Sequence, residues 1–260
     1  MALNYGEYLQ LERLLGAQQP LSDGPEHDEW LFIAIHQVYE LWFKQILREL
    51  GRLGRGLEAG ETHHALATLK RLLTILKTLV SQVDVLETMT PMSFGSFRHR
   101  LDSASGFESL QFRLVEFALG HKRSSALSHY PDPSPERARL QQALEAHSLW
   151  DSFARFLQHQ GFAVPEAVLT RDVRGPIEPS LELQDVLVQV YRQDALTSQV
   201  CERLVDIDEG LQEWRYRHVK MVERTIGTKF GSGGSSGAEY LKSTLFTPLY
   251  PDLWAIRVKL

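Results

Sequence analysis

The chain has 260 residues, of which 43% are hydrophobic and 23% charged, with a formal net charge of −5 at pH 7. This composition is typical of a globular protein, and the acidic balance argues against nucleic acid as a partner. One cysteine, Cys201, excludes an intrachain disulfide and a multi-thiolate zinc site. No segment has the length of apolar residues needed to span a membrane, and the first residues lack a signal-peptide pattern, so we expect a cytoplasmic protein.

Apolar residues recur with helical spacing along almost the whole chain, which predicts an all-α fold with residues 1–260 in one domain. No stretch of the sequence alternates apolar and polar residues with a period of two, so no strand is predicted. The start of the helix expected from Asp28 to about Gly54 is apolar nearly all round, which predicts a buried helix, about 40 Å long. The predicted helices cover residues 5–15, 28–54, 61–87, 93–101, 107–120, 181–193 and 195–226, with two more between 137 and 160.

Two histidines lie on the predicted long helices among aromatic residues. His36 shares a helix face with Phe32, and His218 lies one turn after Trp214. The commoner interpretation of each is a core histidine with a satisfied hydrogen bond. The alternatives are a neutral imidazole lining an apolar pocket for His36, and an axial ligand of haem iron for His218. Neither has a second histidine four residues away, so a helical zinc pair is not expected.

Residues 231–237 read Gly-Ser-Gly-Gly-Ser-Ser-Gly, directly after the last predicted long helix. The composition is typical of a flexible linker. The alternative is a loop whose backbone comes close to a ligand, because such a loop also needs glycine. A hydrolase elbow is not expected, because a helix precedes the motif and no histidine follows it. Arg98 lies among aromatic residues, where it is either a solvated surface residue or a bidentate partner for a carboxylate.

Together these segments resemble the tryptophan 2,3-dioxygenase family over nearly the whole chain. The resemblance implies an all-helical enzyme that opens the pyrrole ring of L-tryptophan with dioxygen to give N-formylkynurenine, using haem b. It also implies a homotetramer in which the N-terminal segment, residues 1–20, reaches a neighbouring subunit's site. The segments that carry the resemblance are residues 5–9, 27–42, 86–90, 97–98, 105–113, 214–218 and 231–237.

The resemblance also implies roles for individual residues. His218 would be the proximal iron ligand, and His36 would face the indole nitrogen. Ser105 and Gly106 would lie near the oxygen bound at the haem. The remaining residues that it assigns to the substrate are Phe32, Phe94, Arg98 and Ser232, together with Tyr5, Tyr8 and Leu9 from a neighbouring subunit.

Ser232 departs from the family pattern, which usually has threonine at this position. Loss of the threonine methyl would leave a small void beside the substrate. A substrate with an extra methyl near its β-carbon could fill that void. The first alternative function is therefore monooxygenation of tryptophan, or of a β-methylated tryptophan, to an oxindole. The second is a haem-free helical binding protein that has kept the fold.

Overall fold

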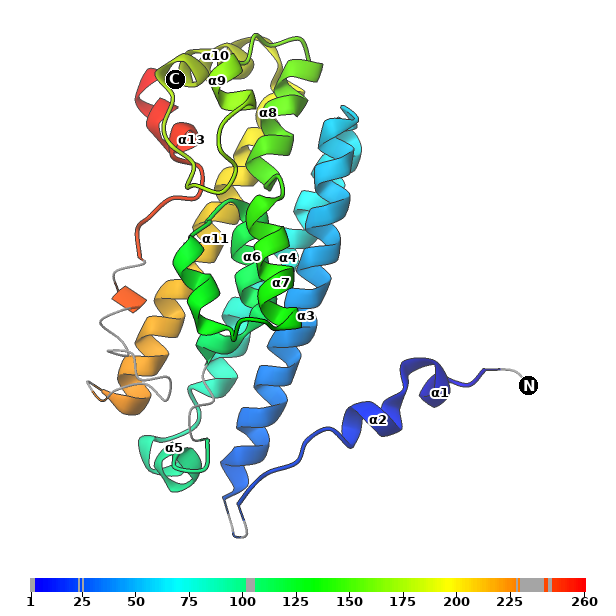
Figure 1. Ribbon diagram of the computed structural model, residues 1–260, viewed down its shortest axis with the longest axis vertical. Helices are drawn as coiled ribbons and strands as arrows, with labels where there is room; N and C mark the ends of the chain where they lie inside the picture. The colour runs from blue at the N-terminus through cyan, green and yellow to red at the C-terminus, as the bar shows by residue number, and fades with distance from the viewer. Residues whose placement is uncertain are drawn as a thin grey trace.

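Three long helices form the body of the molecule. The computed structural model describes residues 3–22, 24, 26–101, 106–227, 229, 241–242 and 245–260. Helices α3 (His27–Glu58), α4 (Thr62–Leu86) and α11 (Ala195–Ile226) lie side by side along an elongated body (Figure 1). Within the described ranges the chain has helices and no β-strand, which confirms the predicted all-α fold. None of the helices found in these ranges is long and apolar enough to cross a membrane.

Shorter helices surround this body. Helix α6 packs against α3, α7 against α6, and α10 lies at the far end near α13 (Figure 1). Helices α1 and α2 extend away from the body as an arm. The bounds are α1 (Tyr5–Leu9), α2 (Leu11–Leu15), α5 (Pro91–Arg98), α6 (Leu110–Leu119), α7 (Pro135–Glu145), α8 (Leu149–His159), α9 (Glu166–Leu169), α10 (Leu181–Gln193) and α13 (Pro251–Ala255), with 3-10 turns at Gly106–Glu108, Ser124–His129 and Ile256–Lys259.

Side-chain caps explain where several helices begin. Ser180 accepts a hydrogen bond from the Leu183 amide at 3.2 Å, and Asp194 accepts one from the Thr197 amide at 3.0 Å. Such caps satisfy amides that have no partner within the helix. The predicted helices 181–193 and 195–226 are confirmed at both ends. Helix α5 begins at Pro91, two residues earlier than predicted, because Pro91 occupies the first turn behind the Thr90 cap.

Several predicted elements differ from the structure. The N-terminal helix is broken at Gln10, whose φ of 54° is left-handed, and so forms two short helices. The helix expected over 107–120 is divided at Ser109, which caps α6 and separates it from a 3-10 turn. Helices α9 and α13 were not predicted. The turn expected at 102–106 and the glycine segment lie wholly or almost wholly outside the described residues.

The core lies between the inner faces of α3 and α4. Contrary to prediction, the start of α3 is not buried all round, because Trp30 is 53% exposed. The Tyr39 hydroxyl donates to the Leu79 carbonyl at 2.9 Å and so ties the two helices together inside the core. Each fully buried leucine on these faces contributes about 1.5–3 kcal/mol. The buried apolar residues of α3 are Ile35, Tyr39, Phe43, Ile46, Leu50, Leu53 and Leu57.

A buried carboxylate holds the C-terminal segment on α11. Asp208 is fully buried, and its Oδ2 accepts hydrogen bonds from the Leu249 amide at 2.8 Å and the Tyr250 amide at 3.1 Å. The Trp254 indole N–H donates to the same oxygen at 2.8 Å. Gln212 donates to the other carboxylate oxygen at 2.9 Å. The chain therefore returns to the body at a defined place after residue 245.

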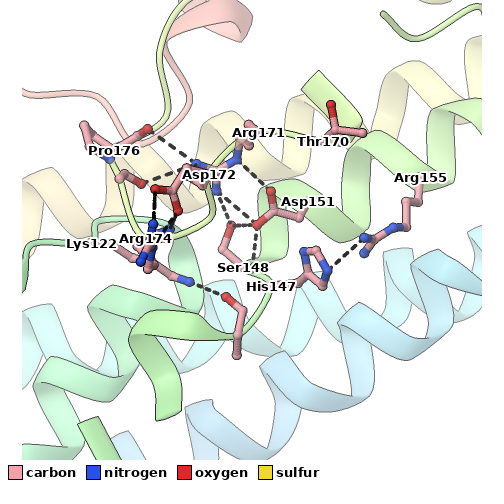
Figure 2. A network of polar contacts seen from close by, with 12 residues as sticks. Lys122, His147, Ser148, Asp151, Arg155, Thr170, Arg171, Asp172, Arg174 and Pro176 are labelled. Atoms are coloured by element: carbon pink, nitrogen blue, oxygen red, sulfur yellow. Dashed lines mark hydrogen bonds and ion pairs between the residues drawn. The ribbon is translucent and has the colours of Figure 1, made fainter. Parts of the chain in front are cut away.

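A polar network fixes the junction of α7, α8 and the segment after α9 (Figure 2). Asp151 caps its own helix by accepting from the Ser148 amide, and Arg171 grips the same carboxylate through Nε at 2.7 Å and Nη2 at 3.0 Å. Burial raises the pKa of Asp151, but the hydrogen bonds from Arg171 and Ser148 outweigh burial and hold it below its usual value. Lys122 Nζ donates to the Leu144 carbonyl at 2.9 Å, near the end of α7.

Candidate functional site

The first part of the candidate site is His36 on α3. Its Nδ1 lies 2.7 Å from the Phe32 carbonyl oxygen. Because a carbonyl only accepts hydrogen bonds, Nδ1 carries the proton and Nε2 keeps a free lone pair. Solvent reaches the ring in this single chain, yet protein crowds around it. This crowding lowers the pKa of His36, against the opposing effects of the Phe32 hydrogen bond and nearby Glu40. The imidazole is therefore neutral at pH 7.

Three phenylalanines surround the same turn of α3. The Phe32 ring lies 4.1 Å from the His36 ring, 5.9 Å from Phe94 and 5.6 Å from Phe97, measured between centroids. Phe94 and Phe97, one turn apart on α5, meet edge to face at 5.5 Å. Arg98, the last residue of α5, is partly exposed next to this cluster. The structure therefore places Phe32 beside both His36 and Phe94, and the roles assigned to these residues stay predictions.

The second part of the site is His218 on α11. Its ring is nearly parallel to that of Trp214, with an angle of 7° and a centroid distance of 5.6 Å. Burial, together with a smaller contribution from His36, lowers the pKa of His218 to about 4. The Trp214 ring beside His218 packs against Tyr39, three residues after His36 on α3, so α11 and α3 meet close to both histidines. Among the described residues, none hydrogen-bonds to the His218 ring.

Aromatic packing holds the Trp214 side chain behind His218. The Trp214 ring lies 6.2 Å from Tyr39, 6.2 Å from Phe43 and 5.1 Å from Phe112. These partners come from α3 and α6, so three helices together fix the ring. Sequence reasoning did not select Phe112 or Phe97. Phe97 could have been found from its helical spacing from Phe94. The contact between Phe112 and Trp214 joins residues 102 positions apart, so no local sequence pattern indicates it.

The N-terminal residues assigned to the substrate are not near this site in the single chain. Tyr5 is 75% exposed and Tyr8 is 72% exposed, both on the arm that extends from the body (Figure 1). Leu9 ends α1 and is also exposed. Their assignment to a neighbouring subunit's site stays a prediction.

Two further assigned residues, Ser105 and Ser232, lie outside the described residues. Gly106 is exposed and begins the 3-10 turn before α6, where its carbonyl accepts from the Ser109 amide at 3.2 Å. In the described part of the chain, no three histidine, cysteine, aspartate or glutamate side chains gather as a metal-binding group. A single histidine can be enough to hold haem iron, so the lack of such a group among the described residues does not bear on the assignment of His218.

The family model described as tryptophan 2,3-dioxygenase matches residues 1–161 and 180–260. The chain belongs to the tryptophan 2,3-dioxygenase family. The predicted family resemblance is thereby confirmed. The residues left unmatched, 162–179, contain α9 and the Arg171 side chain that is bound to Asp151. They lie at the end of the molecule opposite α5 (Figure 1).

Curated relatives agree with this membership of the tryptophan 2,3-dioxygenase family. A protein of Herpetosiphon aurantiacus with that name is 58% identical over 259 residues, covering 100% of this chain and 99% of the relative. The tryptophan 2,3-dioxygenase of Anaeromyxobacter sp. strain K is 60% identical over 256 residues, covering 98% of this chain and 96% of the relative. That of Bacillus thuringiensis subsp. konkukian is 42% identical over 261 residues, covering 99% and 93%. The similarity therefore extends over essentially full-length relatives.

Proposed function

We propose that this chain is a haem b enzyme that opens the pyrrole ring of L-tryptophan with dioxygen and forms N-formylkynurenine. Membership of the tryptophan 2,3-dioxygenase family supports the reaction. One structural observation supports the assignment of the site: each of the two histidines lies against an aromatic ring, and the ring beside His218 packs on α3 close to His36. This arrangement provides one imidazole for iron and a second one for substrate.

The residues around His218 fit a haem ligand. Iron binds the unprotonated imidazole nitrogen, and burial keeps this ring neutral. Trp214 lies parallel to the ring and restricts its rotation. When bound, haem supplies the iron centre that activates dioxygen. His218 would hold that iron from α11, and the aromatic residues behind Trp214 would keep the imidazole in one orientation.

The residues around His36 fit an indole. The ring proton is on Nδ1, which donates it to the Phe32 carbonyl. The lone pair on Nε2 is therefore available to accept a hydrogen bond from the indole N–H. An indole nitrogen is a very weak acid, so we assign His36 to orientation of the substrate and not to obligatory proton removal. Phe32 and Phe94 would pack against the indole ring. Arg98 would bind the substrate carboxylate with two parallel hydrogen bonds.

The exposed arm supports assembly into a homotetramer. Helices α1 and α2 carry apolar side chains that would be exposed to solvent in a monomer. Leucine and tyrosine at 67–75% exposure on a projecting segment are typical of a segment that packs against a partner. We assign this arm to the site of a neighbouring subunit, with Tyr5, Tyr8 and Leu9 near its substrate. The large exposed apolar residues of the arm are Leu3, Tyr5, Tyr8, Leu9, Leu14 and Leu15.

Turnover with labelled dioxygen tests the proposed function. The haem-loaded protein is incubated with L-tryptophan under ¹⁸O₂, and the product is identified by mass spectrometry. Two labelled atoms in N-formylkynurenine are expected. One labelled atom in an oxindole would replace the dioxygenase assignment by monooxygenation. A purified protein with no Soret band after incubation with haem would contradict both. A parallel reaction with β-methylated tryptophan tests the consequence of serine at position 232.

A further inference from the structure

Glu40 lies one helical turn after His36, on the same face of α3. Its carboxylate points at the start of α6. Oε1 accepts a hydrogen bond from Ser109 Oγ at 2.5 Å, and Oε2 accepts one from Gln111 Nε2 at 3.0 Å. The same Gln111 amide donates to the main-chain carbonyl of Glu40 at 2.9 Å. Three hydrogen bonds thus join one residue of α3 to two residues at the start of α6.

Ser109 passes this restraint on to the turn before α6. Its Oγ accepts from the Phe112 amide at 3.2 Å, so Ser109 caps α6 while its own hydroxyl proton goes to Glu40. Its amide donates to the Gly106 carbonyl at 3.2 Å. Glu40 therefore determines where the Gly106 turn lies relative to the helix that carries His36.

The start of α6 also contacts the other part of the site. The Phe112 ring packs at 5.1 Å from Trp214, whose ring lies parallel to His218. A shift of the first turn of α6 would consequently move the Gly106 turn and disturb the packing behind His218. The negative charge of Glu40 has a second effect, because it raises the pKa of His36 and partly opposes burial.

We propose that Glu40 is a positioning residue for the reaction: its carboxylate clamps the start of α6, and with it Gly106, against the face of α3 that carries His36. The inference rests on the proposed function, since the resemblance alone assigns Gly106 to the oxygen side. Glu40 acts through Ser109 and Gln111, not through the substrate. The cost of its loss therefore falls on kcat, and the KM for tryptophan changes little.

Two variants of Glu40 and one matched control test this clamp. Glu40→Ala removes all the carboxylate hydrogen bonds. Glu40→Gln keeps the shape, because its amide can donate to Ser109 while its oxygen accepts from Gln111. The control is Glu58→Ala, since Glu58 is a carboxylate at the far end of α3 that accepts from Ser152 Oγ on α8 at 2.9 Å. For each protein, kcat and KM for tryptophan are measured on the haem-loaded enzyme. Amide hydrogen exchange over residues 106–113 is measured with and without haem.

We expect Glu40→Ala to lower kcat about 10- to 100-fold, the range that displacement of a reacting group by about 1 Å causes, with the KM for tryptophan within about threefold. Glu40→Gln should recover most of that loss, and exchange over 106–113 should rise in Glu40→Ala even without haem. Glu58→Ala should change neither quantity. Faster exchange with an unchanged kcat, or unchanged exchange, would each overturn the clamp.

A double-mutant cycle decides whether Glu40 acts through Ser109. If it does, Glu40→Ala combined with Ser109→Ala lowers kcat no further than the more damaging single variant. Independent, multiplying losses would overturn the inference. Should the wild-type protein bind haem but not oxidise tryptophan, the proposed function fails, while the exchange measurements still test the contact of Glu40 with α6. The two failures are thus distinguishable.

Discussion

Replacement of Asp208 by alanine is expected to release the C-terminal segment from α11. The substitution leaves three buried donors, the Leu249 and Tyr250 amides and the Trp254 indole, without their shared acceptor. A hydrogen bond to a charged group contributes about 1.5–3 kcal/mol, and removal of a buried carboxylate also removes its cost of desolvation. We therefore expect the free energy of unfolding to fall by about 3–5 kcal/mol. Asp208→Asn keeps one acceptor oxygen and should cost about 2 kcal/mol.

Urea unfolding followed by circular dichroism measures this loss, and hydrogen exchange at residues 249–254 shows whether the opening is local. The control is Asp206→Ala, two residues away on α11. Asp206 is partly exposed and forms an ion pair at 2.6 Å with Arg203, three residues earlier on α11, so its removal should cost no more than about 0.5 kcal/mol. If Asp208→Ala comes within about 1 kcal/mol of the control, the buried carboxylate does not hold the segment and our reasoning is wrong.

Three further predictions concern the site and its surroundings. His36→Ala should lower turnover or tryptophan affinity without abolishing either, and complete inactivity with haem and substrate still bound would contradict a purely orienting role. Arg98→Lys should weaken tryptophan binding by about 1–3 kcal/mol, because lysine cannot form the bidentate pair, and an unchanged KM would contradict that pairing. Burial and the Arg215 charge lower the pKa of His121 to about 4. Between pH 6.5 and 4 only the unfolded chain gains a proton at this residue, so the free energy of unfolding decreases as the pH is lowered. His121→Gln should retain about 1–2 kcal/mol more stability than wild type on going from pH 7 to pH 5, and equal losses in urea titrations would refute this.

Much of the helical framework could be predicted, because its signals are local. Periodicity identified the three long helices, and Ser180 and Asp194 are recognisable caps directly before α10 and α11. The break at Gln10 could not be predicted, since neither glycine nor proline marks it. The extension of α3 to Glu58 also lacked a signal, because the glycines near its end are tolerated inside the helix.

The site shows the same division between local and distant information. Phe32 and His36 are one turn apart, so their contact follows from helical spacing. The contact of Phe32 with Phe94 depends on how α5 packs against α3, and no pattern in either helix predicts it. The assignment of His218 and His36 to one site joins residues 182 positions apart and came only from the family resemblance. The hydrogen bond between Glu40 and Ser109 was invisible for the same reason.

The attachment of Arg171 to Asp151 has a consequence for how this chain can vary in length. Residues 162–179, which the family model leaves unmatched, are held at the start of α8 by this bidentate ion pair. Their apolar side chains also pack against the core, namely Phe162, Val164, Val168 and Ile177. This segment lies at the end of the molecule opposite α5 and the start of α3 (Figure 1). A peptide tag or a fluorescent reporter inserted into this segment would therefore lie at the opposite end of the molecule from the candidate site. This segment is the natural place to extend the chain while the site stays intact.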